Sequence, residues 1–173
     1  VFALRIERIK KKASLNQLNS EIGKAVLAAD ATAESFDLRE LWRELTDAYQ
    51  VFFDDFNAHI EDMDEVTIFF CERAKLKTIL SILLGNSIEH GGQGFSVNLR
   101  QLEDGSLMYW DTGTGIPEGV GDQIFSHFTS SGTGSGTGLI IARLLGARAN
   151  LNITRAQGPD HSGAAFSIEK KRL

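Results

Sequence analysis

The chain has 173 residues, of which 42% are hydrophobic and 24% are charged, so it has enough apolar material for one globular domain with its own core. A formal net charge of −5 argues against a non-specific nucleic-acid binder, and the only dense basic run lies at residues 8–12. The single cysteine excludes an internal disulfide, and the longest apolar stretches are far shorter than the roughly 20 residues of a membrane-spanning helix.

Residues 1–31 predict a long amphipathic helix, because apolar residues recur mostly three or four positions apart and no proline interrupts them. Two interpretations stay open for this helix. It can be a helix packed on the surface of the domain, or a coiled-coil arm that leads into a dimer. The apolar positions are Phe2, Leu4, Ile6, Ile9, Leu15, Leu18, Ile22, Val26 and Leu27.

A second helix is predicted to begin at Asp37, which can cap it, with Glu40 three residues later completing a capping box. A stripe of apolar and aromatic residues then recurs at helical spacing, and we expect it to lie in the core. Its members are Leu38, Leu41, Trp42, Leu45, Tyr49, Phe52, Phe53 and Phe56.

The middle of the chain predicts a strand, a helix and a hairpin. Residues 66–70 are rich in β-branched and aromatic residues, which favours a strand. Residues 72–90 have helical spacing and end at a pair of glycines. Residues 95–100 alternate between apolar and polar, and a second apolar run at 107–110 follows a turn, which predicts a hairpin.

A helix from residue 138 to 145 and two strands, 151–154 and 164–168, complete the predicted order. Helices and strands in this order predict an α/β fold, more strictly α+β. We expect a two-layer sandwich in which helices cover one face of a mixed sheet of about five strands, preceded by the N-terminal helix.

The first segment with chemical potential is Asp111-Thr-Gly-Thr-Gly-Ile-Pro117, which follows a predicted strand. A carboxylate at a strand end is a fixed hydrogen-bond acceptor, and Gly113 and Gly115 let the backbone approach a planar ligand. Such an acceptor suits an exocyclic amine like that of adenine.

The second segment is the glycine-rich run 132–138 before the last predicted helix. Backbone N–H groups and the positive end of a helix together form a phosphate site, although the run by itself also fits a flexible linker. It has no lysine of the P-loop kind and does not follow a first strand as a dinucleotide fingerprint does.

The third feature is a helical face formed by Ile82, Asn86 and His90, four residues apart. The amide oxygen of Asn86 suits magnesium, and His90 could meet a phosphate. Read singly, Asn86 also fits an ordinary polar helix residue, and His90 fits a residue that interacts favourably with the helix dipole.

Together these segments resemble, in order, the four motifs of the Bergerat-fold ATPases, the superfamily of DNA gyrase, heat-shock chaperones, mismatch-repair proteins and histidine kinases. Residues 83–90 resemble the N box, 111–116 the first G box, 124–128 the F box and 134–139 the second G box. Because the F box is typical of histidine kinases, the chain resembles the ATP-binding catalytic domain of a two-component sensor histidine kinase.

This resemblance implies ATP and Mg²⁺ as cofactors, with Asn86 and His90 as catalytic residues and Asn86 as the metal ligand. Asp111 would accept a hydrogen bond from the adenine amine, and Phe125 and Phe128 would pack under the lid between the two G boxes. The implied nucleotide-binding residues are Asn86, His90, Asp111, Gly113, Gly115, Ile116, Phe125, Phe128, Gly134, Gly136, Thr137, Gly138 and Leu139.

The resemblance also implies partners and a domain boundary. Residues 1–33 stand where the family has the end of its dimerisation hairpin, and residues 34–173 are the ATP-binding domain. None of the four histidines has the context of a phosphoacceptor. We therefore expect the γ-phosphate to go to a histidine upstream or on another chain, with a response regulator as an indirect partner. We expect the full-length protein to be a homodimer. We expect this part to be cytoplasmic, including as the cytoplasmic part of a membrane-bound sensor.

One departure from the motifs keeps other activities open. Position 82 is isoleucine, whereas the hydrolysing members have a glutamate that activates water, and isoleucine cannot take a proton. A nucleotide-binding pseudokinase or signalling scaffold is one alternative. An anti-sigma-type serine kinase is another, although that group usually keeps the acidic residue that is missing at this position.

Overall fold

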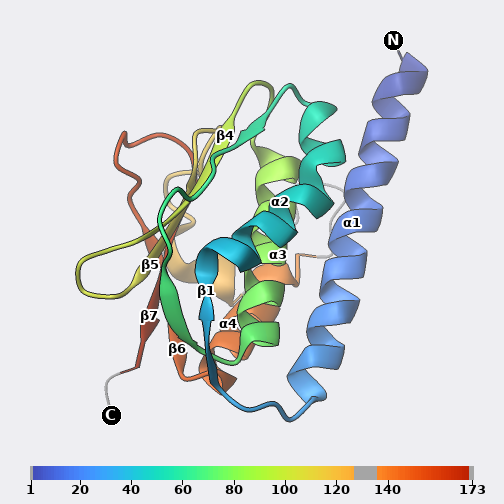
Figure 1. Cartoon of the computed structure of the whole chain (residues 1–173). Coiled ribbons are helices and arrows are strands. Elements are labelled where there is room, and N and C mark those ends of the chain that lie inside the picture. The colour runs from blue at the N-terminus through green and yellow to red at the C-terminus, as the bar shows by residue number, and fades with distance from the viewer. Residues whose placement is uncertain (1, 127–135, 172–173) are drawn as a thin grey trace.

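The structure is a computed structural model that describes residues 2–126 and 136–171. Its elements in chain order are α1 (Phe2–Ala28), β1 (Glu34–Asp37), α2 (Leu38–Asp54), β2 (His59–Ile60), β3 (Ile68–Cys71), α3 (Arg73–His90), β4 (Ser96–Gln101), β5 (Leu107–Asp111), the 3-10 helix η1 (Gly121–Phe125), α4 (Gly138–Arg148), β6 (Leu151–Ala156) and β7 (Ala165–Lys170). Figure 1 shows the sheet on one side, α2, α3 and α4 against it, and α1 along the outside.

The main sheet has five strands in the order β2-β4-β5-β7-β6. β2 runs parallel to β4, and the other neighbours are antiparallel, so the sheet is mixed. This confirms the predicted two-layer fold. β1 and β3 form a separate antiparallel pair, so the strand predicted at 66–70 exists, shifted to Ile68–Cys71, but lies outside the main sheet.

The predicted cap of α2 is present at Asp37. Its Oδ1 accepts a hydrogen bond from the backbone N–H of Arg39 at 2.9 Å and from that of Thr67 at 3.2 Å. A cap of this kind satisfies one of the free N–H groups at a helix start and contributes about 1 kcal/mol. The second bond also ties the start of α2 to the segment that leads into β3.

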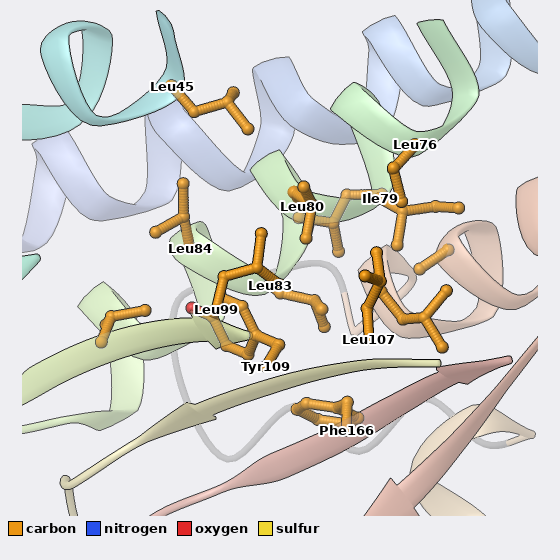
Figure 2. Packing of buried hydrophobic residues seen from close by; sticks show 14 of the residues in the cluster. Leu45, Leu76, Ile79, Leu80, Leu83, Leu84, Leu99, Leu107, Tyr109 and Phe166 are labelled. Carbon is orange, nitrogen blue, oxygen red and sulfur yellow. The ribbon is translucent and has the colours of Figure 1, made fainter. Parts of the chain in front are cut away.

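The core lies between the helices and the sheet, with α3 at its centre and a stripe of α2 beside it. In Figure 2, leucine and isoleucine side chains of α3 meet Leu99, Leu107 and Tyr109 from the sheet, with Phe166 of β7 beside them. Leu76, Leu83 and Tyr109 are fully buried. Burying one such large side chain contributes roughly 1.5 to 3 kcal/mol. The helix is therefore held firmly, and its C-terminal half presents side chains at a defined place.

The N-terminal helix α1 packs against α3 and α4. Its contact face carries the buried residues Leu15, Asn19 and Ser20, whereas Leu18 and Ile22 of the predicted apolar seam are 53% and 44% exposed. The contact therefore combines polar residues with Leu15, Val26 and Leu27, which pack on the core. Among the helices of residues 2–126 and 136–171, none combines the length and apolar character of a membrane span.

Candidate nucleotide-binding site

A cavity of about 610 Å³ opens between the C-terminal half of α3, the end of β5, the loop after β5 and the start of α4. It is large enough for a ligand of nucleotide size. Eight of the residues expected to contact nucleotide line it, namely Asn86, His90, Asp111, Gly115, Ile116, Gly136, Gly138 and Leu139. These eight residues, up to 53 positions apart in the sequence, thus meet around one cavity.

Asp111 ends β5 and is only 4% exposed. Its Oδ1 accepts hydrogen bonds from the backbone N–H groups of Gly113 and Ala164, both at 3.0 Å. Its Oδ2 accepts a hydrogen bond from the Ser87 hydroxyl at 2.6 Å. A buried carboxylate is stable only with such partners. The expected adenine acceptor is therefore fixed in orientation at the cavity wall.

The loop after Asp111 is held by close backbone contacts. A Cβ at Gly113 would lie 2.5 Å from the Cα of Gly91, so Gly113 packs on the end of α3 and is not among the residues that line the cavity. Gly115 does line it and has a φ of +77°, a conformation that favours glycine. Thr114 donates its hydroxyl hydrogen to the carbonyl oxygen of His90 at 2.6 Å, which ties the loop to α3.

Asn86 and His90 lie in the last turns of α3, facing the same cavity as the start of α4. The Oδ1 of Asn86 is 3.9 Å from the point that a Cβ at Gly138 would occupy, and Ile82 is 3.2 Å from that point. Glycine at the first residue of α4 therefore keeps space open beside the Asn86 oxygen. The first N–H groups of a helix have no intrahelical partner, so they are available to an anion here.

A magnesium ion would have few protein ligands at this place. Within the two described stretches of chain, no group of three or more histidine, cysteine, aspartate or glutamate residues could hold a metal. The Asn86 oxygen and the space beside it fit Mg²⁺, which keeps several waters and usually takes one or two protein ligands plus phosphate oxygens. Asn86 is thus the residue that would hold the ion, together with the nucleotide.

Phe125, in the F box, does not line the cavity but supports a residue that does. Its ring packs edge-on against Phe166, with centroids 6.1 Å apart, and the Arg143 guanidinium lies 5.1 Å from its centroid. Phe166 forms part of the cavity wall. Thr137 shares a hydrogen bond with Ser20 at 3.2 Å. The expected contacts Phe128 and Gly134 lie outside the described residues.

The cavity wall also includes Asn16, Asn19 and Ser20 of α1, which sequence reasoning missed. Asn16 donates a hydrogen bond to Glu89, and Asn19 donates to the carbonyl oxygen of Ser81 at 2.9 Å. Polar residues on a helix ordinarily indicate a solvated face. Asn16, Asn19 and Ser20 stand three or four positions apart on one side of the helix, but periodicity does not show what that side contacts.

Residues 71–172 match a family model described as histidine kinase-, DNA gyrase B- and HSP90-like ATPase. The chain belongs to this ATPase family. The resemblance drawn from the four motifs is therefore confirmed, and the member described here carries an ATP-binding domain.

One curated relative of this ATPase-family member is the signal transduction histidine-protein kinase AfsQ2 of Streptomyces coelicolor, 32% identical over 101 residues. The match covers 54% of this chain and 19% of that protein, so the chain spans about a fifth of the relative's length.

Solved histidine kinase structures share the fold of this ATPase-family member. The catalytic domain of histidine kinase ThkA in a nucleotide-free form has a TM-score of 0.68 and 25% identity, over 82% of this chain and 96% of that one. Histidine kinase AdeS of Acinetobacter baumannii has a TM-score of 0.67 and 21% identity, over 88% and 75%. The cytoplasmic segment of QseC has a TM-score of 0.64 and 11% identity, over 92% and 95%.

Proposed function

We propose that this chain is the ATP-binding domain of a two-component sensor histidine kinase, which transfers the γ-phosphate of ATP to a histidine outside these 173 residues. One observation carries the proposal. A buried, oriented carboxylate at Asp111 and a glycine that begins α4 beside Asn86 line the same cavity. The first suits an adenine amine and the second suits phosphates and their metal ion.

In the proposed reaction the protein acts mainly by positioning and by neutralising charge. Asn86 would hold magnesium, which when bound draws together and neutralises the phosphate oxygens. The N–H groups at the start of α4 would receive phosphate oxygens, and His90, whose side chain is 51% exposed, stands at the open edge. Ile82 is 2% exposed in the cavity wall and accepts no proton, so it cannot activate water as a general base.

The partners belong to the same proposal. Residues 1–33 would be the end of a dimerisation hairpin and residues 34–173 the catalytic domain, in a protein that forms homodimers. The phosphoacceptor would lie upstream or on the partner chain, a response regulator would take the phosphoryl group next, and the domain would work in the cytoplasm. Support comes from the continuous helix α1, which joins the domain through only five residues between Ala28 and Glu34.

Ile82 favours one alternative, a pseudokinase that binds nucleotide and signals through protein contacts. Transfer of label from [γ-³²P]ATP to the histidine of a cognate hairpin separates the two functions. Label that remains on ATP while nucleotide binds would favour the pseudokinase, and label on the hairpin would exclude it.

The test of the binding site itself is calorimetric titration of ATP with and without magnesium, for the natural chain and for Asp111→Asn. Asparagine would turn an N–H donor toward the adenine amine in place of an acceptor. Losing a hydrogen bond to a charged acceptor costs about 1.5 to 3 kcal/mol, so we expect affinity to fall roughly ten- to hundredfold.

Asp47→Asn is the matched control, since Asp47 is exposed on α2 and is not among the cavity residues. It should bind as the natural chain does. If neither the natural chain nor the control binds ATP with magnesium, the proposed function is wrong. If Asp111→Asn binds as tightly as the control while its melting temperature is unchanged, the adenine assignment is wrong.

A further inference from the structure

A chain of buried hydroxyl groups runs from the core to the carboxylate at the cavity wall. The Tyr109 hydroxyl lies 2.9 Å from Ser87 Oγ, and Ser87 Oγ lies 2.6 Å from Asp111 Oδ2. Tyr109 is completely buried, and Ser87 and Asp111 are 3% and 4% exposed. Tyr109 and Asp111 come from β5, two residues apart and on the same face, and Ser87 reaches them from α3.

The direction of the hydrogens in this chain follows from the number of donors. An ionised carboxylate only accepts, so the single hydrogen of Ser87 points to Asp111. The Ser87 oxygen then accepts from Tyr109, which has one hydrogen to donate. Burial raises the pKa of Tyr109 well above its usual value, and the charge of Asp111 raises it further. Tyr109 therefore stays protonated and remains a donor.

The two oxygens of Asp111 are occupied differently. Oδ1 receives two backbone N–H groups, from Gly113 and Ala164. Oδ2 receives Ser87, and in the described part of the chain this is the only hydrogen bond to it. A carboxylate oxygen has two lone-pair directions in the carboxyl plane. Three donors thus lock the plane, and one direction of Oδ2 is left for a ligand in the cavity that Asp111 lines.

We propose that Ser87 is the positioning residue that makes the Asp111 site selective for a base with an exocyclic amine, and that Tyr109 orients the Ser87 hydroxyl for this task. The inference rests on the proposed ATP site and deepens it. Without Ser87, the carboxylate would keep only the two bonds on Oδ1 and could rotate Oδ2 away from the amine. Tyr109 does not line the cavity and Ser87 does, and in this proposal both hydroxyl groups act on the base through the carboxylate.

A comparison of two ligands isolates this role. ATP carries the exocyclic amine, and purine riboside triphosphate carries a hydrogen in its place. The Kd of purine riboside triphosphate divided by the Kd of ATP therefore measures amine recognition alone. For Ser87→Ala we expect this ratio to fall about five- to tenfold, because the bond from the amine to an unfixed carboxylate is weaker. For Tyr109→Phe we expect a fall of about twofold, and no further fall when it is combined with Ser87→Ala, because both act through one chain.

Thr78→Val is the matched control. Thr78 is a buried residue of α3 whose hydroxyl hydrogen goes to the carbonyl oxygen of Ala74, so the substitution removes a buried hydroxyl from the same helix without touching Asp111. Its ligand ratio should equal that of the natural chain, although its stability will fall.

Two results would overturn the inference. The first is an unchanged ratio in Ser87→Ala, whether the binding of neither ligand changes or both are weakened by the same factor, as a packing defect would do. If Ser87→Ala does not fold, an unchanged ratio in Tyr109→Phe, which keeps the ring and its packing, overturns the inference instead. A natural chain that binds neither ligand contradicts the proposed function itself, and a natural chain that binds both equally contradicts the adenine assignment of Asp111.

Discussion

Replacing Gly163 by alanine should destabilise the protein far more than the same replacement at Gly94. The two residues have nearly the same backbone conformation, with φ of +66° and +69°. They differ in surroundings. A Cβ at Gly94 would meet nothing within 4 Å, whereas a Cβ at Gly163 would lie 1.8 Å from the backbone oxygen of Asp111. Gly94→Ala thus measures the cost of the conformation, and Gly163→Ala adds the cost of the clash.

The magnitudes follow from the contacts that must give way. Alanine at positive φ costs about 1 kcal/mol once the reduced freedom of the unfolded chain is included. Relieving the clash at Gly163 would separate Ala164 from Asp111, and with it the bond from Asp111 N to the Ala164 oxygen and the bond from Ala164 N to Asp111 Oδ1. At roughly 1 kcal/mol per hydrogen bond, the total for Gly163→Ala is about 3 kcal/mol.

Thermal unfolding followed by far-UV circular dichroism measures the difference. For a chain of this size, 1 kcal/mol corresponds to about 2 to 4 °C, so we expect the melting temperature to fall by roughly 2 to 4 °C in Gly94→Ala and 6 to 12 °C in Gly163→Ala. ATP affinity should fall only in the second variant, because only there does the Asp111 carboxylate move. Equal losses of stability within about 0.5 kcal/mol would refute the reasoning.

Two further predictions concern the packing of α1 and the buried thiol of Cys71. A Cβ at Gly23 would lie 2.6 Å from Ile141 Cγ2, so Gly23→Leu should loosen α1 from α4 and speed amide exchange in residues 15–27 while α3 stays protected. The control Lys24→Leu, on the exposed side of α1, should leave amide exchange unchanged. Equal exchange in the two variants would contradict this packing. Burial raises the pKa of Cys71 from 9.0 to about 12, so the folded chain should react slowly with a disulfide reagent at pH 8 and rapidly in urea. Because the unfolded thiol loses its proton first as pH rises above 9, the free energy of unfolding should fall between about pH 9 and 12, and Cys71→Ala should lose that part of the decline.

Much of the fold could be predicted from the sequence because its signals are local. The cap at Asp37, the helix from residue 73 to 90 and the hairpin around residue 105 each depend on neighbours a few positions away. β1 and β2 were not predicted. β2 has only two residues, too few for an alternating pattern. The four residues of β1 are mostly polar, and their partners in β3 lie 31 to 37 positions away in the sequence.

The site divides in the same way. Asp111, Asn86 and the glycines could be named because their motifs are contiguous and ordered. Ser87 could not be given a role, since a serine within a helix has many uses and its partners Tyr109 and Asp111 become neighbours only through packing of α3 on β5. Gly113 was expected beside the ligand, and the motif did not reveal that the loop also passes so close to Gly91 that a Cβ at Gly113 would lie 2.5 Å from its Cα. Both cases depend on tertiary contacts that spacing does not encode.

The docking of α1 couples the position of this helix to the occupancy of the cavity. Asn16, Asn19 and Ser20 belong to α1 and also to the cavity wall, and Ser20 shares a hydrogen bond with Thr137, the residue directly before α4. If an occupant of the cavity changes the equilibrium between docked and released α1 by some factor, release of α1 changes the affinity of that occupant by the same factor. In that case a force or partner that releases α1 changes nucleotide affinity, and the nucleotide concentration changes the fraction of chains in which α1 is docked.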